Sequence, residues 1–84
     1  WILHGPAVDM VEKPAWFSEQ KTAYVSLLPF GTPVRSVTLT GFEYPLNCYD
    51  MDVNAVIGTS NQLTETQGRI SFEAGSLLCS IVEE

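Results

Sequence analysis

Near its middle the sequence reads Cys48-Tyr49-Asp50-Met51-Asp52-Val53-Asn54-Ala55-Val56-Ile57, and apolar and polar residues alternate along nearly all of this stretch. In an extended backbone, successive side chains point to opposite faces. We therefore expect a half-buried β-strand over residues 48–57. Its predicted apolar face comprises Tyr49, Met51, Val53, Ala55 and Ile57, and its polar face comprises Cys48, Asp50, Asp52 and Asn54.

Other segments predict strands by their β-forming residues and by alternation, at residues 22–28, 34–40, 69–73 and 77–82, with two weaker candidates at 1–4 and 63–66. Glycine and proline interrupt them about every ten residues, which is typical of small antiparallel sandwiches and barrels. The sequence thus predicts an all-β fold, a small antiparallel β-sandwich or barrel of about 5–7 strands. Residues 1–21, which contain Pro14, are expected to form an irregular or short-helical N-terminal arm, and 22–84 the sheet core.

The length of 84 residues fits a single β-rich domain over 1–84. The chain begins with Trp1 rather than Met, so we expect a processed chain, a fragment or a terminal domain of a longer one. The N-terminus then gives no sign of location, although an extracellular module or a particle assembly is slightly favoured. Apolar runs reach only three residues, so no membrane-spanning helix is expected.

The chain is acidic, with ten Asp and Glu residues against four Lys and Arg residues and a formal charge of −6. Proteins that bind the phosphate backbone of nucleic acids draw much of their affinity from clustered cations. Nucleic acid is therefore excluded as an expected partner, and so is an anionic membrane surface. A cationic partner or a metal ion is electrostatically easier to bind.

Asp50, Asp52 and Asn54 alternate as the first ligands of a calcium-binding loop do, so they are weak metal candidates. The rest of the EF-hand pattern is missing, because Ala55 stands where a glycine is needed and Asn61 where a glutamate is needed. On a strand the candidates would be about 7 Å apart and would need help from a residue such as Glu43 or Glu65. We predict a solvated polar face, no metal and no cofactor.

The two cysteines, Cys48 and Cys79, allow one disulfide that would close a loop of about thirty residues. The alternative is two buried thiols, because cysteine is often buried without a bridge. A zinc site with His4 would lack the short ligand spacings that bring such residues together.

No catalytic residue is predicted. Asp50 and Asp52 have a spacing that glycoside hydrolases use, but any strand with alternate carboxylates produces it. His4, the only histidine, lies close to the chain end, and the nucleophile elbow and phosphate-binding glycine loop are absent. The inventory therefore predicts that the chain is not an enzyme.

Aromatic residues in turn-rich segments are candidate ligand contacts. Trp16 and Phe17 lie in the irregular arm, while Phe42 and Tyr44 flank Glu43 in a connection between strands. Packing of these rings in the core is the alternative. If one pair is exposed, we expect Phe42 and Tyr44 to form a flat platform that binds carbohydrate or another ligand, helped by Glu43.

The last predicted strand, residues 77–82, is apolar on both faces, which indicates burial on both sides or a subunit contact. Our first hypothesis is therefore a non-catalytic structural or assembly module that forms homo-oligomers or a larger assembly. The second is a carbohydrate- or ligand-binding β-sandwich module. The third is a subunit of an enzyme completed by another chain. The predicted interface residues are Leu77, Leu78, Ile81 and Val82.

Overall fold

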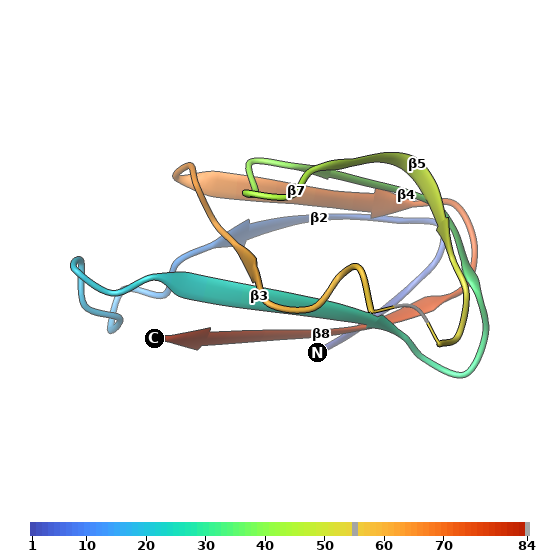
Figure 1. Cartoon of the computed structure of the whole chain (residues 1–84), viewed down its shortest axis with the longest axis horizontal. Coiled ribbons are helices and arrows are strands. Elements are labelled where there is room, and N and C mark those ends of the chain that lie inside the picture. Colours follow the sequence, from blue (N-terminus) through green and yellow to red (C-terminus); the bar gives the residue numbers. More distant parts are fainter. Residues whose placement is uncertain (55, 84) are drawn as a thin grey trace.

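The computed structural model describes residues 1–54 and 56–83 and shows a sandwich of two antiparallel sheets (Figure 1). Each sheet has four strands, and no helix occurs in these residues. Consequently no helix in the described part of the chain is suited to crossing a membrane. The strands are β1 (Ile2–His4), β2 (Ala7–Glu12), β3 (Ala23–Pro29), β4 (Val34–Thr40), β5 (Leu46–Met51), β6 (Asn61–Gln62), β7 (Gln67–Phe72) and β8 (Ser76–Glu83).

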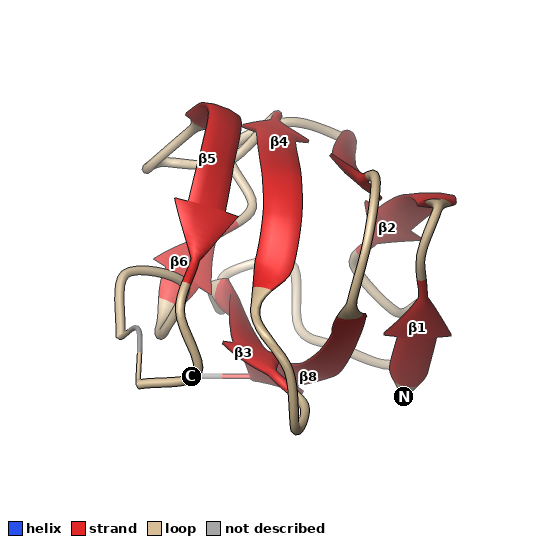
Figure 2. Cartoon of the chain, turned by 90° about the vertical axis from the view of Figure 1, so that its right-hand side faces the viewer, coloured by secondary structure: helices blue, strands red, loops and turns tan. Residues whose placement is uncertain are grey.

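The chain crosses repeatedly between the two layers. One sheet has the strand order β1-β8-β3-β6 and the other β2-β7-β4-β5. Figure 2 views the sandwich from one end, with β4 beside β5 in one layer and β3 beside β8 in the other. The predicted all-β, small antiparallel sandwich is therefore confirmed.

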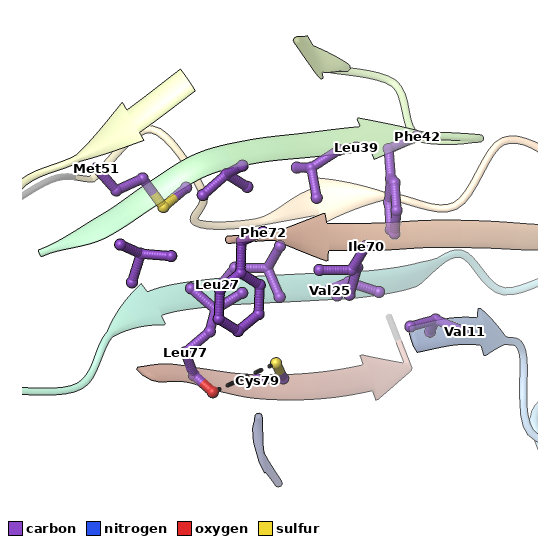
Figure 3. Packing of buried hydrophobic residues seen from close by; sticks show 12 residues of the cluster. Val11, Val25, Leu27, Leu39, Phe42, Met51, Ile70, Phe72, Leu77 and Cys79 are labelled. Atoms are coloured by element: carbon purple, nitrogen blue, oxygen red, sulfur yellow. Dashed lines mark hydrogen bonds between the residues drawn. The ribbon is translucent and has the colours of Figure 1, made fainter. Parts of the chain in front are cut away.

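The core lies between the sheets and is built by alternation along the inner strands. On β3 the residues Val25 and Leu27 are buried, and their neighbours across the core include Leu39 on β4 and Ile70 on β7 (Figure 3). Replacing a buried leucine or isoleucine by alanine typically lowers the free energy of unfolding by about 2–5 kcal/mol. The buried cluster comprises Val11, Val25, Leu27, Val34, Val37, Leu39, Phe42, Met51, Ile70, Phe72, Leu77 and Cys79.

The predicted strand at residues 48–57 is wrong over its second half. Strand β5 ends at Met51, and turns joined by irregular residues follow through the described residues up to Ser60; Ala55 lies outside the described residues. Of the described residues on the predicted apolar face, Met51 alone is buried, whereas Tyr49, Val53 and Ile57 are exposed. The reason is that β5 is an edge strand paired irregularly with β4, where register shifts accompany the positive φ of Ser36 (57°) and Cys48 (50°).

The N-terminal segment is more regular than its sequence indicated. Residues Ile2–His4 and Ala7–Glu12 are strands of opposite sheets, so the irregular part shrinks to residues 13–22. Val11 faces the core while Val8 faces solvent, a period of two that pairing with β7 imposes. The helix considered at Pro14 is a hydrogen-bonded turn, in which the Phe17 N–H donates to the Pro14 carbonyl at 3.0 Å.

Candidate functional site

Three connections gather at one end of the sandwich, at residues 13–22, 41–45 and 63–66 (Figure 1). Strand pairing places them there, because Glu12 lies opposite Gln67 and Leu39 opposite Leu46. An isolated bridge between Phe42 and Leu63 joins two of the connections directly. We refer to residues 13–22, 41–45 and 63–66, with the adjoining Asn61, as the loop end.

Asn61 organises the loop end from within. It is 1% exposed and is the one buried polar side chain among residues 1–54 and 56–83. Its Oδ1 accepts from the backbone N–H of Tyr44 at 2.9 Å and of Gln62 at 3.0 Å, and its Nδ2 donates to the Tyr44 carbonyl at 2.9 Å. A buried amide is stable only when its groups are paired, and these bonds fix the backbone of Tyr44.

Backbone bonds tie the rest of the connection 41–45 to the same segment. The Glu43 N–H donates to the Gln62 carbonyl at 2.8 Å, and the Thr64 N–H donates to the Gly41 carbonyl at 3.0 Å. Both side chains that follow Phe42, those of Glu43 and Tyr44, are exposed, with Tyr44 at 60%. The loop end therefore presents an aromatic ring and a carboxylate from a fixed backbone.

The predicted platform of Phe42 and Tyr44 does not form. Phe42 is 5% exposed and belongs to the core, where a Cβ on Gly68 would lie 2.6 Å from its ring. The backbone bends between the two aromatic residues, so they do not share one face as they would in an extended segment. Of the predicted binding residues, Tyr44 and Glu43 face solvent and Phe42 packs.

Asn61 was not among the binding residues predicted from the sequence, where it appeared only as a mismatch to the calcium-loop pattern. The segment at residues 58–62 lies along the edge of β3, where the Leu27 N–H donates to the Gly58 carbonyl at 2.9 Å and the Ser60 N–H donates to Ser26 Oγ at 3.0 Å. Its tight approach needs Gly58, since a Cβ there would lie 2.5 Å from the Leu27 carbonyl oxygen. The sequence around Asn61 is polar, so nothing in it predicts that this side chain is buried. The one available signal is Gly58, three residues earlier, which is compatible with close packing of the segment.

The loop end also carries further aromatic and charged side chains. Trp16 is 82% exposed and meets Phe17 edge-on, with ring centroids 6.1 Å apart. Glu83 accepts a hydrogen bond from the Ser18 N–H, and Lys13 donates to the Lys21 carbonyl. Glu43 and Glu65 have no salt-bridge partner in the described part of the chain. Exposed carboxylates beside aromatic rings favour a cationic organic ligand.

The metal candidates are separated by the end of β5. Asp50 accepts a hydrogen bond from the Ser36 N–H at 3.0 Å and lies 3.7 Å from Arg35, whereas Asp52 and Asn54 follow the strand in a turn. Among residues 1–54 and 56–83, no three His, Cys, Asp or Glu side chains are grouped as metal ligands. Asp50 thus has a local role beside the irregular β4 backbone.

Cys48 and Cys79 are free thiols on different sheets, so the disulfide considered from the sequence is absent. The expectation of two buried thiols is correct only for Cys79, because Cys48 is exposed. Burial raises the pKa of the Cys79 thiol to about 11. Cys48 borders a shallow hollow of about 400 Å³ on the outer face of the β2-β7-β4-β5 sheet, and its N–H donates to Thr38 Oγ1 at 3.1 Å.

The remaining predicted residues divide between core and surface. Leu77 is fully buried and Ile81 packs against the core, whereas Leu78 and Val82 point outward with exposures of 37% and 55%. His4 shares a 2.8 Å hydrogen bond with Ser76 Oγ.

Residues 17–77 match the family model described as thiamin pyrophosphokinase, vitamin B1 binding domain. The chain belongs to this family. The matched segment includes Tyr44, Glu43 and Asn61.

Relatives agree with this membership. The thiamine pyrophosphokinase of Bacillus subtilis is 35% identical over 60 residues, which cover 71% of this chain and 28% of that protein. Its crystal structure superposes with a TM-score of 0.79 at 32% identity, over 93% of this chain and 34% of that one. The structure of thiamin pyrophosphokinase from Geobacillus thermodenitrificans gives 0.79 at 30% identity, covering 99% of this chain and 35% of that one. The chain spans about a third of the length of these relatives.

The family overturns the first functional hypothesis. The predictions of a non-catalytic structural or assembly module and of a chain that is not an enzyme are both wrong, because the matched family is a ligand-binding domain of an enzyme. The second hypothesis, a carbohydrate- or other ligand-binding module, comes closer, because the family is described as a binding domain, but the ligand in that description is vitamin B1 and not a carbohydrate. The absence of catalytic motifs led to the wrong prediction because the chain matches only about a third of the enzyme it resembles. A domain of that size need not contain the reacting groups.

Proposed function

We propose that this chain is the thiamine-binding domain of a thiamine pyrophosphokinase and that its loop end contacts the vitamin. The observation that carries the proposal is the family match over residues 17–77, which contains the connection held by Asn61. The relatives that the chain matches are enzymes named for pyrophosphoryl transfer to thiamine. The domain would hold the acceptor of that transfer.

The chemistry of the loop end suits this acceptor. Thiamine combines an aminopyrimidine with a permanently cationic thiazolium ring. An exposed tyrosine ring attracts a flat cation by about 0.5–1 kcal/mol or more, depending on desolvation. Tyr44 offers such a ring at 60% exposure, and the exposed Glu43 beside it adds a favourable charge. Because the Tyr44 backbone is fixed by Asn61, little ordering is needed on binding.

The phosphate groups of the reaction fit poorly with this domain. It has four Lys and Arg residues and a formal charge of −6, whereas sites for phosphate groups gather cations and backbone N–H groups. We therefore assign the pyrophosphoryl donor to the part of the enzyme that the longer relatives contain in addition. This domain would orient the thiamine and attract its positive charge.

Titration of the full chain with thiamine tests the proposal. Binding is measured by calorimetry and, in a Trp1→Phe variant, by the fluorescence of Trp16. Replacing Tyr44 by Ala is expected to weaken binding about 5–10-fold, because the ring contact is lost. Replacing Glu43 by Gln is expected to weaken it about 3-fold, with the difference shrinking at high salt.

Matched variants serve as controls. Tyr49 is also an exposed tyrosine, at 41%, but lies on the outer edge strand β5, so Tyr49→Ala should leave thiamine affinity unchanged. Glu73→Gln, at the opposite end of the sandwich, controls for the loss of charge. Equal effects of Tyr44→Ala and Tyr49→Ala, or the absence of thiamine binding at millimolar concentration, would overturn the proposal.

A further inference from the structure

The turn at residues 14–21 presents a tryptophan at the loop end. Trp16 is 82% exposed, the largest exposure of any large hydrophobic side chain within residues 1–54 and 56–83. Phe17, which meets its ring edge-on, belongs to the same turn. Tryptophan is enriched among the side chains that dominate protein–protein binding, because its large ring gains much on burial. The turn therefore carries an anchor that the domain itself leaves in water.

Hydrogen bonds fix the conformation of this turn. The Phe17 N–H donates to the Pro14 carbonyl at 3.0 Å, and the Lys21 N–H donates to the Ser18 carbonyl at 3.1 Å. The Ser18 N–H also donates to the carboxylate of Glu83, the last residue of β8. A segment that is ordered before it meets a partner loses little conformational entropy on binding. The turn is thus preorganised for docking.

The same turn is tied to the proposed thiamine contact. Ala23, where β3 begins after the turn, accepts a hydrogen bond from the Leu63 N–H at 3.2 Å, and Leu63 forms a bridge with Phe42. Phe42 stands two residues before Tyr44. The three connections of the loop end are therefore joined in series, at one end of the sandwich (Figure 1). A partner that approaches Tyr44 from outside the domain meets this end, and with it Trp16.

We propose that Trp16 anchors the loop end to the part of the enzyme that binds the pyrophosphoryl donor, which we call the donor part. This contact rests on the function proposed above, in which the domain holds thiamine at the loop end and the donor site lies outside the chain. The chain spans about a third of the length of its relatives, which leaves ample length for a second domain. Because donor and acceptor must come together for transfer, the donor part approaches the loop end.

Charge complementarity supports the same partner. Within the described residues, the loop end and the strand ends that border it carry five carboxylates and two lysines. These are Glu12, Glu19, Glu43, Glu65 and Glu83, and Lys13 and Lys21. Lys13 donates to the Lys21 carbonyl. A site that binds pyrophosphoryl groups gathers cations, so the donor part is attracted to this acidic end. Trp16 supplies the apolar contact at its centre.

Photo-crosslinking in the whole enzyme tests this contact. Benzoylphenylalanine replaces Trp16, and mass spectrometry identifies the peptides that it joins after irradiation. We expect links to peptides of the donor part, outside residues 1–84. Phe30 is the matched control position, because it is an aromatic residue with 51% exposure that follows β3 at the opposite end of the sandwich. The same probe at position 30 should give no such links.

Each outcome of the crosslinking decides the proposal. Links from position 16 that stay within residues 1–84, of the same or another copy, would overturn it, and so would equal links to the donor part from positions 16 and 30. Titration of the 84-residue chain with thiamine is read separately. A chain that binds thiamine but gives no link from position 16 contradicts the docking contact alone, whereas the absence of thiamine binding contradicts the proposed function.

Trp16→Ala separates docking from ligand binding. In the whole enzyme it should lower kcat/KM about 10-fold, because the anchor is lost. The thiamine affinity of the 84-residue chain, measured by calorimetry, should stay the same. Trp16→Phe should restore most of the activity, Phe30→Ala should leave it unchanged, and circular dichroism checks the fold of each variant. A Trp16→Ala enzyme with full activity would show that this side chain is not the anchor.

Discussion

Asn61 bonds to both backbone groups of Tyr44, accepting from its N–H at 2.9 Å and donating to its carbonyl at 2.9 Å. A side-chain amide thereby imitates the partner strand that the connection 41–45 lacks. The arrangement links a buried position on β6 to an exposed ring proposed to contact thiamine, so that core packing and ligand binding share one residue.

Replacing Asn61 by Ala should therefore reduce stability and thiamine affinity together. Two N–H groups and one carbonyl lose their partner, at about 1–3 kcal/mol for each group that stays buried and unpaired. Because part of the connection can move toward water, we expect a total loss of about 2–4 kcal/mol in the free energy of unfolding. Urea denaturation measures it.

Asn47→Ala is the control for this variant, since Asn47 is exposed on β5 and should cost less than about 0.5 kcal/mol. Asn61→Asp keeps the accepting oxygens but loses the donor and buries a charge. It should also be destabilising. An Asn61→Ala protein as stable as Asn47→Ala would show that the hydrogen bonds are replaced without cost.

A pair of glycines separates backbone strain from steric overlap. Gly31 and Gly41 both have positive φ, at 85° and 82°, but only Gly41 is crowded, since a Cβ there would lie 2.5 Å from the Gln67 carbonyl oxygen. Gly31→Ala should cost about 1–2 kcal/mol through its left-handed conformation alone. Gly41→Ala should cost clearly more, because β7 must shift at the loop end. Equal denaturation midpoints for the two variants would contradict this.

The sequence predicted the inner strands well, because runs of β-forming residues between glycine and proline turn signals mark them. Residues 34–40 were expected as a strand and form β4, while 77–82 form most of β8. Alternation failed on β5, where Asp50 accepts from Ser36 and the irregular pairing breaks the period. It also failed at Ala7–Glu12, where pairing with β7 decides a segment whose own pattern is weak.

The candidate site was harder to predict for a physical reason. Tyr44 and Glu43 were chosen as loop residues and are exposed, but the bend after Phe42, which sends that ring into the core, depends on contacts with Leu63 and Gly68. Asn61 is distant from Tyr44 in sequence, and its role arises only when β6 meets the connection 41–45. Hydrogen bonds between residues so far apart produce no periodic pattern in the sequence, so they cannot be predicted from it.

The two thiols should differ sharply in reactivity. Cys48 is exposed, while Cys79 is 1% exposed within the core. A thiol reagent at about pH 8 should label one cysteine quickly and the second only after denaturant is added. Mass spectrometry of the labelled peptides identifies the site, and Cys48→Ala should remove the fast phase. Rapid labelling of Cys79 in the native protein would contradict its placement in the core.

Cys79 should also make stability depend on alkaline pH. Burial raises its pKa from 9.0 to about 11, so the folded state holds the thiol proton more tightly than the unfolded state. Below about pH 9 both states keep the proton and this contribution to stability is fully present. Between 9.0 and about 11 the unfolded chain loses it first, and stability falls as pH rises. The total loss should approach about 2–3 kcal/mol.

Urea midpoints at about pH 8 and about pH 10.5 measure the loss, and comparison with Cys79→Val removes the effect of tyrosines and lysines. Cys48→Ala should retain the full dependence, whereas an identical decline in wild type and Cys79→Val would assign the effect to other groups.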